Sequence, residues 1–360
     1  MKKICFMGFS LFSIGGCQKV TISLANNLCN KYDVHILSLC EIPNPNNYHV
    51  DERVNVHSFN MPLDLRVRGS ISLFFKIRKF LEENKIDILF VAGLLPAPVI
   101  TILRPFLKLK VVFCEHENLS GRDKKTVFLK RLACKMSDKV VVLTKQTLED
   151  YIDKTNISRN KITHIYNYVD DELLQKNMFC DINSKKIISV GRLVEEKGFN
   201  IAIDVASKVF KKHPDWQWNI YGDGPDREKL NNKIKNMNLE NNFFLKGYAS
   251  DITEKYKEHS IFVLTSHREG FALVLVEAKA SALPVVSFNC SSGPSEIVRD
   301  DIDGYLVSCY DKDYMSNKIC DLIENLELRQ RFSDNAKGNI ENFSKHKILK
   351  QWFNLIEEIT

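Results

Sequence analysis

Two patterns of apolar and polar positions alternate along the chain. Short apolar runs bounded by polar turns are typical of buried parallel strands, whereas apolar positions spaced three or four residues apart indicate helices. In the first half the short runs lie at 3–8, 33–39, 54–59, 86–91, 110–114, 140–143 and 161–165, and a helical pattern covers 70–83. In the second half they lie at 186–190, 216–221, 243–247, 261–264 and from 284, with helical patterns over 201–210, 314–326, 327–339 and 344–359. Strands that alternate with helices predict an α/β fold with parallel sheets.

The chain has 360 residues, more than one hydrophobic core usually holds, so we expect two domains. Two successive series of strands and helices predict two Rossmann-like domains. The polar stretch 171–184 has the character of a domain boundary. We therefore expect an N-terminal domain at 1–166, a connector at 167–184, a C-terminal domain at 185–343 and a final helix at 344–360.

The composition is that of an ordinary globular protein, with 44% hydrophobic and 27% charged residues. The ten cysteines include no C-x-x-C pair, which argues against a zinc site or a disulfide framework and fits a reducing cytoplasm. The uncharged stretch 88–103 has only 16 residues and contains Pro96 and Pro98, so it is too short and too broken to span a membrane. We therefore do not expect an integral membrane protein.

Positive charge is concentrated in the first half of the chain. Of the net charge of +6, residues 1–166 contribute +10, from 25 Lys and Arg against 15 Asp and Glu, and the remaining residues contribute −4. The stretch 122–139 holds seven Lys or Arg against two Asp on a predicted helix whose other side is apolar. Such a helix can lie on an anionic bilayer or bind a diphosphate-linked lipid, but an ordinary solvated surface helix has the same pattern. Both interpretations stay open.

The N-terminal stretch also allows two interpretations. Two lysines precede an apolar run that ends in Ile14-Gly15-Gly16-Cys17, which resembles the cleavage site of a lipoprotein signal. Cleavage there would remove the first predicted strand. We therefore favour a strand, a glycine-bearing loop and a helix N-terminus, an arrangement that binds anions.

The stretch 266–288, SHREGFALVLVEAKASALPVVSF, is the centre of the second half. A polar turn after the preceding strand holds Glu269 and Gly270. A helix then begins near Phe271 and carries Glu277. A helix N-terminus at the end of a parallel strand binds diphosphates, because its first N–H groups have no partner within the helix. One carboxylate is then placed to face a cleft and the other to reach the far end of a nucleotide.

Several motifs of this chain resemble the signature of glycosyltransferase family 4. EGFALVLVEA at 269–278 contains the two glutamates of that signature, and GRLVEEKGF at 191–199 matches its diphosphate-binding loop. YGDGP at 221–225, SGPSEI at 292–297 and DGYLV at 303–307 complete the pattern, whereas the likeness over the first half is weak. The resemblance implies a retaining enzyme of GT-B fold, in which two Rossmann-like domains face each other across a cleft and the last helix packs back on the first domain.

The resemblance also implies a site for a nucleotide-sugar donor. The residues expected to hold its diphosphate are Gly16, Arg192, Lys197, Gly270, Phe271 and Ala272. At Gly16 a side chain would occupy the space of the ligand. Glu277 is expected to bind the ribose hydroxyls and Glu269 the hexose, while His116, at the end of a predicted strand, is expected to contact the transferred sugar. Glu269 and His116 are thus the expected catalytic residues.

The expected chemistry needs no metal and no cofactor. The diphosphate gains negative charge as the glycosidic bond breaks, and two fixed cations stabilise that charge. In this family a same-face substitution is usual, with the leaving phosphate accepting the proton, although Glu269 is also a candidate nucleophile. The pairs Asp301/Asp303 and Asp311/Asp313 would suit a metal-dependent GT-A transferase. However, Asp303 before a glycine indicates a turn, and Asp311 indicates a helix cap.

The expected function is transfer of a hexose or N-acetylhexosamine from a UDP-linked sugar to a saccharide. The basic first half suggests a lipid-linked acceptor in surface polysaccharide, lipopolysaccharide or capsule synthesis, in the cytoplasm or peripherally on the inner face of the plasma membrane. No nucleic acid partner is expected. A sugar-nucleotide epimerase of GT-B fold is one alternative, and an exported two-lobed sugar-binding lipoprotein cleaved at Cys17 is another.

Three positions depart from the family pattern. Ala272 and Ala282 stand where the family commonly has glycine, and Cys290 where it often has a polar residue. We expect Ala272 to crowd the donor phosphates slightly. None of these departures changes the assignment.

Overall fold

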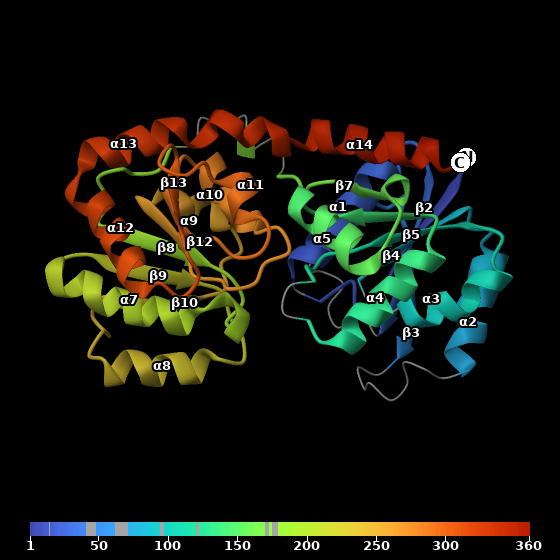
Figure 1. Ribbon diagram of the computed structural model, residues 1–360, viewed down its shortest axis with the longest axis horizontal. Helices are drawn as coiled ribbons and strands as arrows, with labels where there is room; N and C mark the ends of the chain where they lie inside the picture. Colours follow the sequence, from blue (N-terminus) through green and yellow to red (C-terminus); the bar gives the residue numbers. More distant parts are fainter. Residues whose placement is uncertain are drawn as a thin grey trace. The chain divides into compact units, whose positions relative to one another are not determined.

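The structure is a computed structural model that describes residues 1–13, 15–40, 48–61, 71–93, 97–119, 122–169, 173–174 and 179–360. The chain forms two compact units, one made of Met1–Asn167 with Ile348–Thr360 and the other of Tyr168–Lys347. Each unit contains one parallel sheet with helices packed on it (Figure 1). The expectation of two Rossmann-like domains is therefore confirmed.

The first unit is built on a seven-stranded sheet in the order β3-β2-β1-β4-β5-β6-β7. Its strands are β1 (Lys3–Gly8), β2 (Asp33–Cys40), β3 (Asn55–Met61), β4 (Ile88–Ala92), β5 (Lys110–Cys114), β6 (Lys139–Val142) and β7 (Ile162–His164). Its helices within residues 1–167 are α1 (Gly16–Leu28), α2 (Ile71–Glu83), α3 (Ala97–Leu103), α4 (Lys124–Met136) and α5 (Lys145–Thr155). The inner strands are almost entirely apolar, as expected where helices cover both faces of a parallel sheet.

Strand β1 is an inner strand, paired with β2 on one side and β4 on the other. Its residues Ile4, Cys5 and Met7 are fully buried. Cleavage at Cys17 would remove this strand and both of its hydrogen-bonded ladders. The lipoprotein alternative therefore conflicts with the fold.

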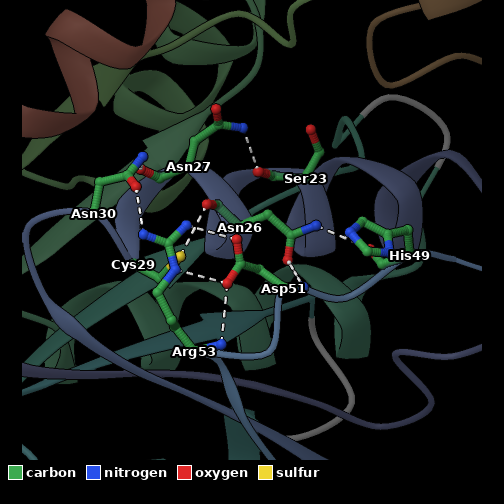
Figure 2. A network of polar contacts seen from close by, with 8 residues as sticks. All are labelled: Ser23, Asn26, Asn27, Cys29, Asn30, His49, Asp51 and Arg53. Carbon is green, nitrogen blue, oxygen red and sulfur yellow. Dashed lines mark hydrogen bonds and ion pairs between the residues drawn. The ribbon is translucent and has the colours of Figure 1, made fainter.

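The segment before β3 is tied to helix α1 by polar side chains (Figure 2). The Asn26 amide donates to the carbonyl oxygen of His49 at 2.9 Å, and its own oxygen accepts from the N–H of Asp51 at 3.0 Å. Arg53 then pairs with Asp51 at 2.6 Å. A side-chain amide that makes both bonds of a peptide group fixes the path of the chain into β3.

The second unit repeats the order, with a six-stranded sheet arranged β10-β9-β8-β11-β12-β13. Its strands are β8 (Lys186–Val190), β9 (Gln217–Tyr221), β10 (Phe243–Gly247), β11 (Ile261–Leu264), β12 (Val285–Phe288) and β13 (Gly304–Val307). Its helices are α7 (Phe199–Lys212), α8 (Arg227–Asn236), α9 (Ile252–Lys257), α10 (Leu273–Ala280), α11 (Pro294–Ile297), α12 (Lys312–Glu324) and α13 (Leu326–Asn335). The strand order reverses between β8 and β11, where open α/β sheets bind ligands.

The last helix, α14 (Lys345–Glu358), returns to the first unit. Its Trp352 is only 7% exposed and meets the ring of Phe90 edge-on at 5.8 Å. Near the end of the chain, Glu357 and Glu358 form ion pairs with Lys31 and Lys139. The expected return of the last helix to the first domain is thus observed.

Several elements differ in detail from the sequence prediction. Helix α10 begins at Leu273 rather than near Phe271, so Glu277 lies just over one turn into it. Helix α13 ends at Asn335 and continues as a 3₁₀ segment to Phe343. Within the predicted connector, residues 170–172 and 175–178 lie outside the described residues.

None of the helices in the described part of the chain is both long enough and apolar enough to cross a lipid bilayer.

Candidate active site

The loop after β8 and the loop after β11 are held together by backbone contacts. Gly198 has a left-handed φ of +66°, and a Cβ there would lie 2.1 Å from the carbonyl oxygen of Thr265. The Thr265 hydroxyl donates to the carbonyl oxygen of Lys197 at 3.0 Å. The N–H of His267 donates to the carbonyl oxygen of Glu196 at 3.1 Å. Only glycine allows this close approach, which places Lys197 beside the start of the 266–288 stretch.

The closest contact between two predicted site residues joins Lys197 and Glu269. Lys197 Nζ lies 2.6 Å from Glu269 Oε1, and the two side chains are 25% and 8% exposed. Ser292 secures the same turn, because its hydroxyl donates to the carbonyl oxygen of Glu269 at 2.8 Å. A nearly buried carboxylate paired with a half-buried ammonium holds both groups in fixed positions at the carboxyl end of the sheet.

Arg192 stands on the loop after β8 with its side chain exposed. The loop is shaped by the YGDGP turn, which packs directly against it. A Cβ at Gly222 would lie 1.9 Å from the carbonyl oxygen of Gly191, and a Cβ at Gly224 would lie 2.4 Å from that of Leu193. These glycines therefore serve the backbone packing on either side of Arg192 rather than chemistry.

The start of helix α10 is built on an unusual backbone. Ala272, its N-cap residue, is left-handed, with a φ of 65°. Phe271, the residue before Ala272, packs closely against Gly293. A Cβ at Gly293 would lie 2.4 Å from the carbonyl oxygen of Phe271. The Phe271 side chain is buried and meets the ring of Phe343 at 5.6 Å. Its ring thus serves packing, which leaves the backbone of Gly270, Phe271 and Ala272 as the part able to reach a ligand.

Glu277 lies on α10 and is held by a tyrosine that sequence reasoning missed. The Tyr256 hydroxyl, on α9, donates to Glu277 Oε2 at 3.2 Å. Burial and the neighbouring Glu277 carboxylate raise the pKa of Tyr256 well above its ordinary value, so it stays a donor. No motif marks Tyr256 in the sequence, because its role depends on how α9 packs under α10.

In the first unit, Gly16 is the first residue of α1, and it is exposed. A Cβ at Gly16 would meet no atom within 4 Å. The fold therefore does not require glycine there. The neighbouring Gly15 is fixed by the Tyr48 hydroxyl, which accepts from its N–H at 2.8 Å and donates to its carbonyl at 3.0 Å.

His116 is the second residue after β5 and lies beside Cys17, the residue after Gly16. Its Nδ1 is buried and has no hydrogen-bond partner among the described residues. Burial would lower the pKa of His116, but Cys17 and the Glu117 carboxylate outweigh it and raise the pKa above its ordinary value. The first unit thus brings together the start of α1 and the histidine, two features that the sequence placed far apart.

The aspartate pairs have structural partners. Asp303 is fully buried and lies 2.9 Å from Lys279 and 2.6 Å from Arg299. Asp311 caps helix α12, accepting from the N–H of Tyr314 at 2.9 Å, which confirms its expected role as a cap. Asp303 and Asp311 therefore serve the fold through contacts that the structure shows.

The structure brings some predicted site residues into contact and separates others. Lys197 and Glu269 touch, and Glu277 gains the partner Tyr256. Arg192 and the start of α10 extend from the carboxyl ends of neighbouring strands of the same sheet, β8 and β11. Gly16 and His116 belong to the first unit, and the remaining predicted residues to the second.

Comparisons with known proteins match both halves of the chain to glycosyltransferases. Residues 14–173 match "Glycosyltransferase Family 4" and residues 170–339 match "Glycosyl transferases group 1". An uncharacterized glycosyltransferase of Haemophilus influenzae is 32% identical over 356 residues, covering 98% of this chain and 99% of that protein. The GalNAc-alpha-(1->4)-GalNAc-alpha-(1->3)-diNAcBac-PP-undecaprenol alpha-1,4-N-acetyl-D-galactosaminyltransferase of Campylobacter jejuni is 25% identical, covering 100% of this chain and 99% of its own.

Solved structures show the same fold. HepE of Anabaena, solved in complex with UDP, matches with a TM-score of 0.83 and 20% identity, covering 99% of this chain and 100% of that one. At that level of identity the likeness concerns the fold alone. It confirms the two-domain GT-B fold expected from the sequence.

Proposed function

The chain belongs to the glycosyltransferases of family 4 and group 1, and we propose that it transfers a hexose or N-acetylhexosamine from a UDP-sugar to a saccharide acceptor with retention of configuration. The observation that carries this proposal is the Lys197–Glu269 pair, 2.6 Å apart, at the carboxyl end of the second sheet. It joins the basic loop after β8 to the loop that starts α10. In this proposal the cation contacts the donor diphosphate, and the carboxylate contacts the sugar attached to it.

Three features support a diphosphate site. Lys197 is already held in place by Glu269, so its side chain loses little conformational entropy when the ammonium contacts a phosphate. Arg192 is exposed on the same loop and offers a planar fork of donors. The backbone of 270–272 at the start of α10 adds N–H groups where a helix N-terminus favours anions. These groups supply positive charge to the leaving diphosphate, and we propose that no metal ion takes part.

The proposed reaction is a same-face substitution. The bond between the anomeric carbon and the leaving phosphate oxygen breaks while a bond to the acceptor hydroxyl oxygen forms on the same face. The acceptor proton passes to the leaving phosphate, so the diphosphate serves as the base. Glu269 would bind hexose hydroxyls and stabilise the positive charge that develops on the sugar.

We propose a separate donor contact for each of the remaining predicted residues. Glu277 would accept from the ribose hydroxyls, with its carboxylate held by Tyr256. Gly16 would let a phosphate approach the first turn of α1, in the open space where a Cβ meets nothing. His116 would donate to a hydroxyl of the transferred sugar, since its raised pKa favours the protonated form.

We propose a lipid-linked saccharide as acceptor, reached at the inner face of the plasma membrane. The first unit exposes four large apolar side chains on helices α2 to α4 and the turn between them. They are Phe75, Ile102, Phe106 and Phe128, each between 56% and 64% exposed. Lys124 and Lys125 are exposed four and three residues before Phe128 on α4, so basic and apolar groups share one side of this helix. The Campylobacter relative, whose name includes PP-undecaprenol, supports the same acceptor class.

Sedimentation with anionic vesicles tests the membrane contact. The protein should sediment with phosphatidylglycerol vesicles at low ionic strength and be released by salt. Phe128→Ser should weaken this binding, whereas Phe179→Ser, which alters an equally exposed phenylalanine of the second unit, should not. Equal sedimentation of both variants and the parent would contradict the proposed face.

The reaction itself is tested by incubating the protein with UDP-sugars and saccharide acceptors and determining the anomeric configuration of the product by NMR. Retention is the expected result, and inversion would overturn the proposed mechanism. Incubation without an acceptor separates the transferase from the epimerase, because only an epimerase would convert the donor sugar to its epimer under those conditions.

A further inference from the structure

The loop that carries His116 is anchored by a buried cluster of charges. Glu115 is 1% exposed, and its Oε2 lies 2.8 Å from Nζ of Lys130, whose side chain is fully buried. The hydroxyl of Tyr151, also fully buried, donates to the same oxygen. The other oxygen, Oε1, accepts from the N–H of Glu117 at 2.9 Å. One carboxylate therefore joins the end of β5, helix α4, helix α5 and the turn after His116.

The cluster continues to the far side of His116. Arg122 donates to Glu117 Oε2 at 2.6 Å, and Lys130 Nζ lies 3.7 Å from the same oxygen. The N–H of Glu115 donates to the carbonyl oxygen of Val141, so β5 remains bonded to β6 up to the residue before the histidine. His116 is thus the one residue between two glutamates that are both fixed by cations.

Such a cluster is poorly explained by stability alone. Replacing a buried ion pair by apolar side chains of similar volume is often neutral or stabilising, because desolvation offsets the attraction of the charges. The cluster instead fixes the position of the Glu115 carboxylate. An ammonium, a phenol and a peptide N–H, each on a different part of the fold, all contact that carboxylate. The sequence suggested only a basic surface for this helix, yet Lys130 points into the unit.

We propose that Lys130, Tyr151 and Glu115 are positioning residues that set the place of His116 toward the transferred sugar. This inference rests on the proposed function of His116. The three residues would not touch the substrate. Their effect would come through the turn 115–117, whose displacement by roughly 1 Å is enough to lower a catalytic rate by up to about 100-fold.

The test compares Tyr151→Phe and Lys130→Met with Tyr32→Phe, and also with His116→Ala. Tyr32 is a matched control, because it is 5% exposed in the same unit and its hydroxyl has no hydrogen-bond partner among the described residues. The readouts are kcat, KM for the UDP-sugar and the pH dependence of kcat, with the melting temperature recorded for each variant. The double variant Glu115→Gln/Lys130→Met removes both charges and covers the case in which Lys130→Met does not fold.

The expected result is a fall in kcat of about tenfold for Tyr151→Phe and for the lysine variants, with KM for the donor within about twofold of the parent. The pH dependence should shift as well, because the environment of His116 changes. Tyr32→Phe should keep the parent kcat and pH dependence. A Tyr151→Phe protein that behaves like Tyr32→Phe, while His116→Ala is impaired, would overturn the inference and leave the transferase function standing. If His116→Ala keeps the activity of the parent, then His116 has no role in the reaction. The inference about the residues that position it would then fail.

Discussion

Lys197 and Glu269 show how much depends on single side chains. The pair lies 2.6 Å apart with Glu269 nearly buried, so the carboxylate holds the ammonium in place at the carboxyl end of the sheet. The sequence motifs identify both residues, but they do not show that the two are in contact. Contact follows from Gly198, whose left-handed backbone lets the loop after β8 lie against Thr265.

Glu269→Gln should separate the charge of this residue from its shape. We expect kcat to fall by about 100-fold or more, because the charge that stabilises the transition state is lost. The affinity for UDP should change little, since UDP lacks the sugar that Glu269 would contact and the glutamine amide oxygen can still accept from Lys197. Steady-state kinetics and calorimetry on the same preparation measure the two quantities. Unchanged turnover would remove Glu269 from the mechanism.

Two glycines give opposite predictions for the same substitution. Gly222→Ala should destabilise the protein by more than about 1 kcal/mol, because its Cβ would lie 1.9 Å from the carbonyl oxygen of Gly191. Gly16→Ala should leave the free energy of unfolding unchanged or slightly raised, because its Cβ meets no atom and alanine favours a helix. Gly16→Ala should nevertheless weaken binding of the donor.

Denaturant unfolding and donor titration of both variants check this contrast. Loss of stability in Gly16→Ala would mean that the glycine serves the fold. Full donor affinity in a stable Gly16→Ala protein would exclude a phosphate from the first turn of α1.

At the scale of elements, the packing of β9, α9 and β11 depends on a neutral histidine. His259, fully buried, donates from Nδ1 to the carbonyl oxygen of Lys255 at 2.6 Å and accepts at Nε2 from the amide of Asn219 at 2.9 Å. Burial lowers the pKa of His259 to about 4. Helix α9 also supplies Tyr256 to Glu277, so this histidine supports the candidate site indirectly.

The lowered pKa of His259 predicts acid sensitivity. In the unfolded chain His259 has a pKa of about 6.5, so it binds a proton below that pH. In the folded protein it binds a proton only near pH 4. Stability is therefore full above about pH 6.5 and falls as the pH drops toward 4, by about 3 kcal/mol from this residue. His259→Gln should flatten this part of the profile. Denaturant unfolding between pH 4 and 7 measures it, and equal slopes for the two proteins would contradict the assignment.

Strands were easier to predict than the residues that support the site. Buried strands such as β1, β8 and β11 begin and end where the apolar runs do, because burial on both faces leaves a continuous apolar signal. The sequence pattern predicts too early a start for α10, because Ala272 adopts a left-handed conformation that its residue type does not reveal. The sequence does not reveal the roles of Tyr256 and Lys130, since both depend on contacts with residues that are distant in sequence.

At the scale of the whole molecule, the sequence indicates two units, and the structure shows which parts of the chain form each. The last helix belongs to the first unit, with Trp352 against Phe90, so a residue near the end of the chain packs on strand β4. The predicted donor residues also divide between the units, with Gly16 and His116 in one and the rest in the other.

The most direct test of this account is calorimetric titration of UDP, GDP and ADP into the purified protein with a chelator present. We predict that UDP binds without metal and that Lys197→Met weakens this binding by about tenfold or more, because a charge-assisted contact to phosphate is lost. The control Lys185→Met, which alters an exposed lysine paired with Asp215, should keep the parent affinity. Preference for GDP would keep the site and change the donor. Absence of binding by all three nucleotides, or equal affinity in Lys197→Met and the parent, would contradict the diphosphate site.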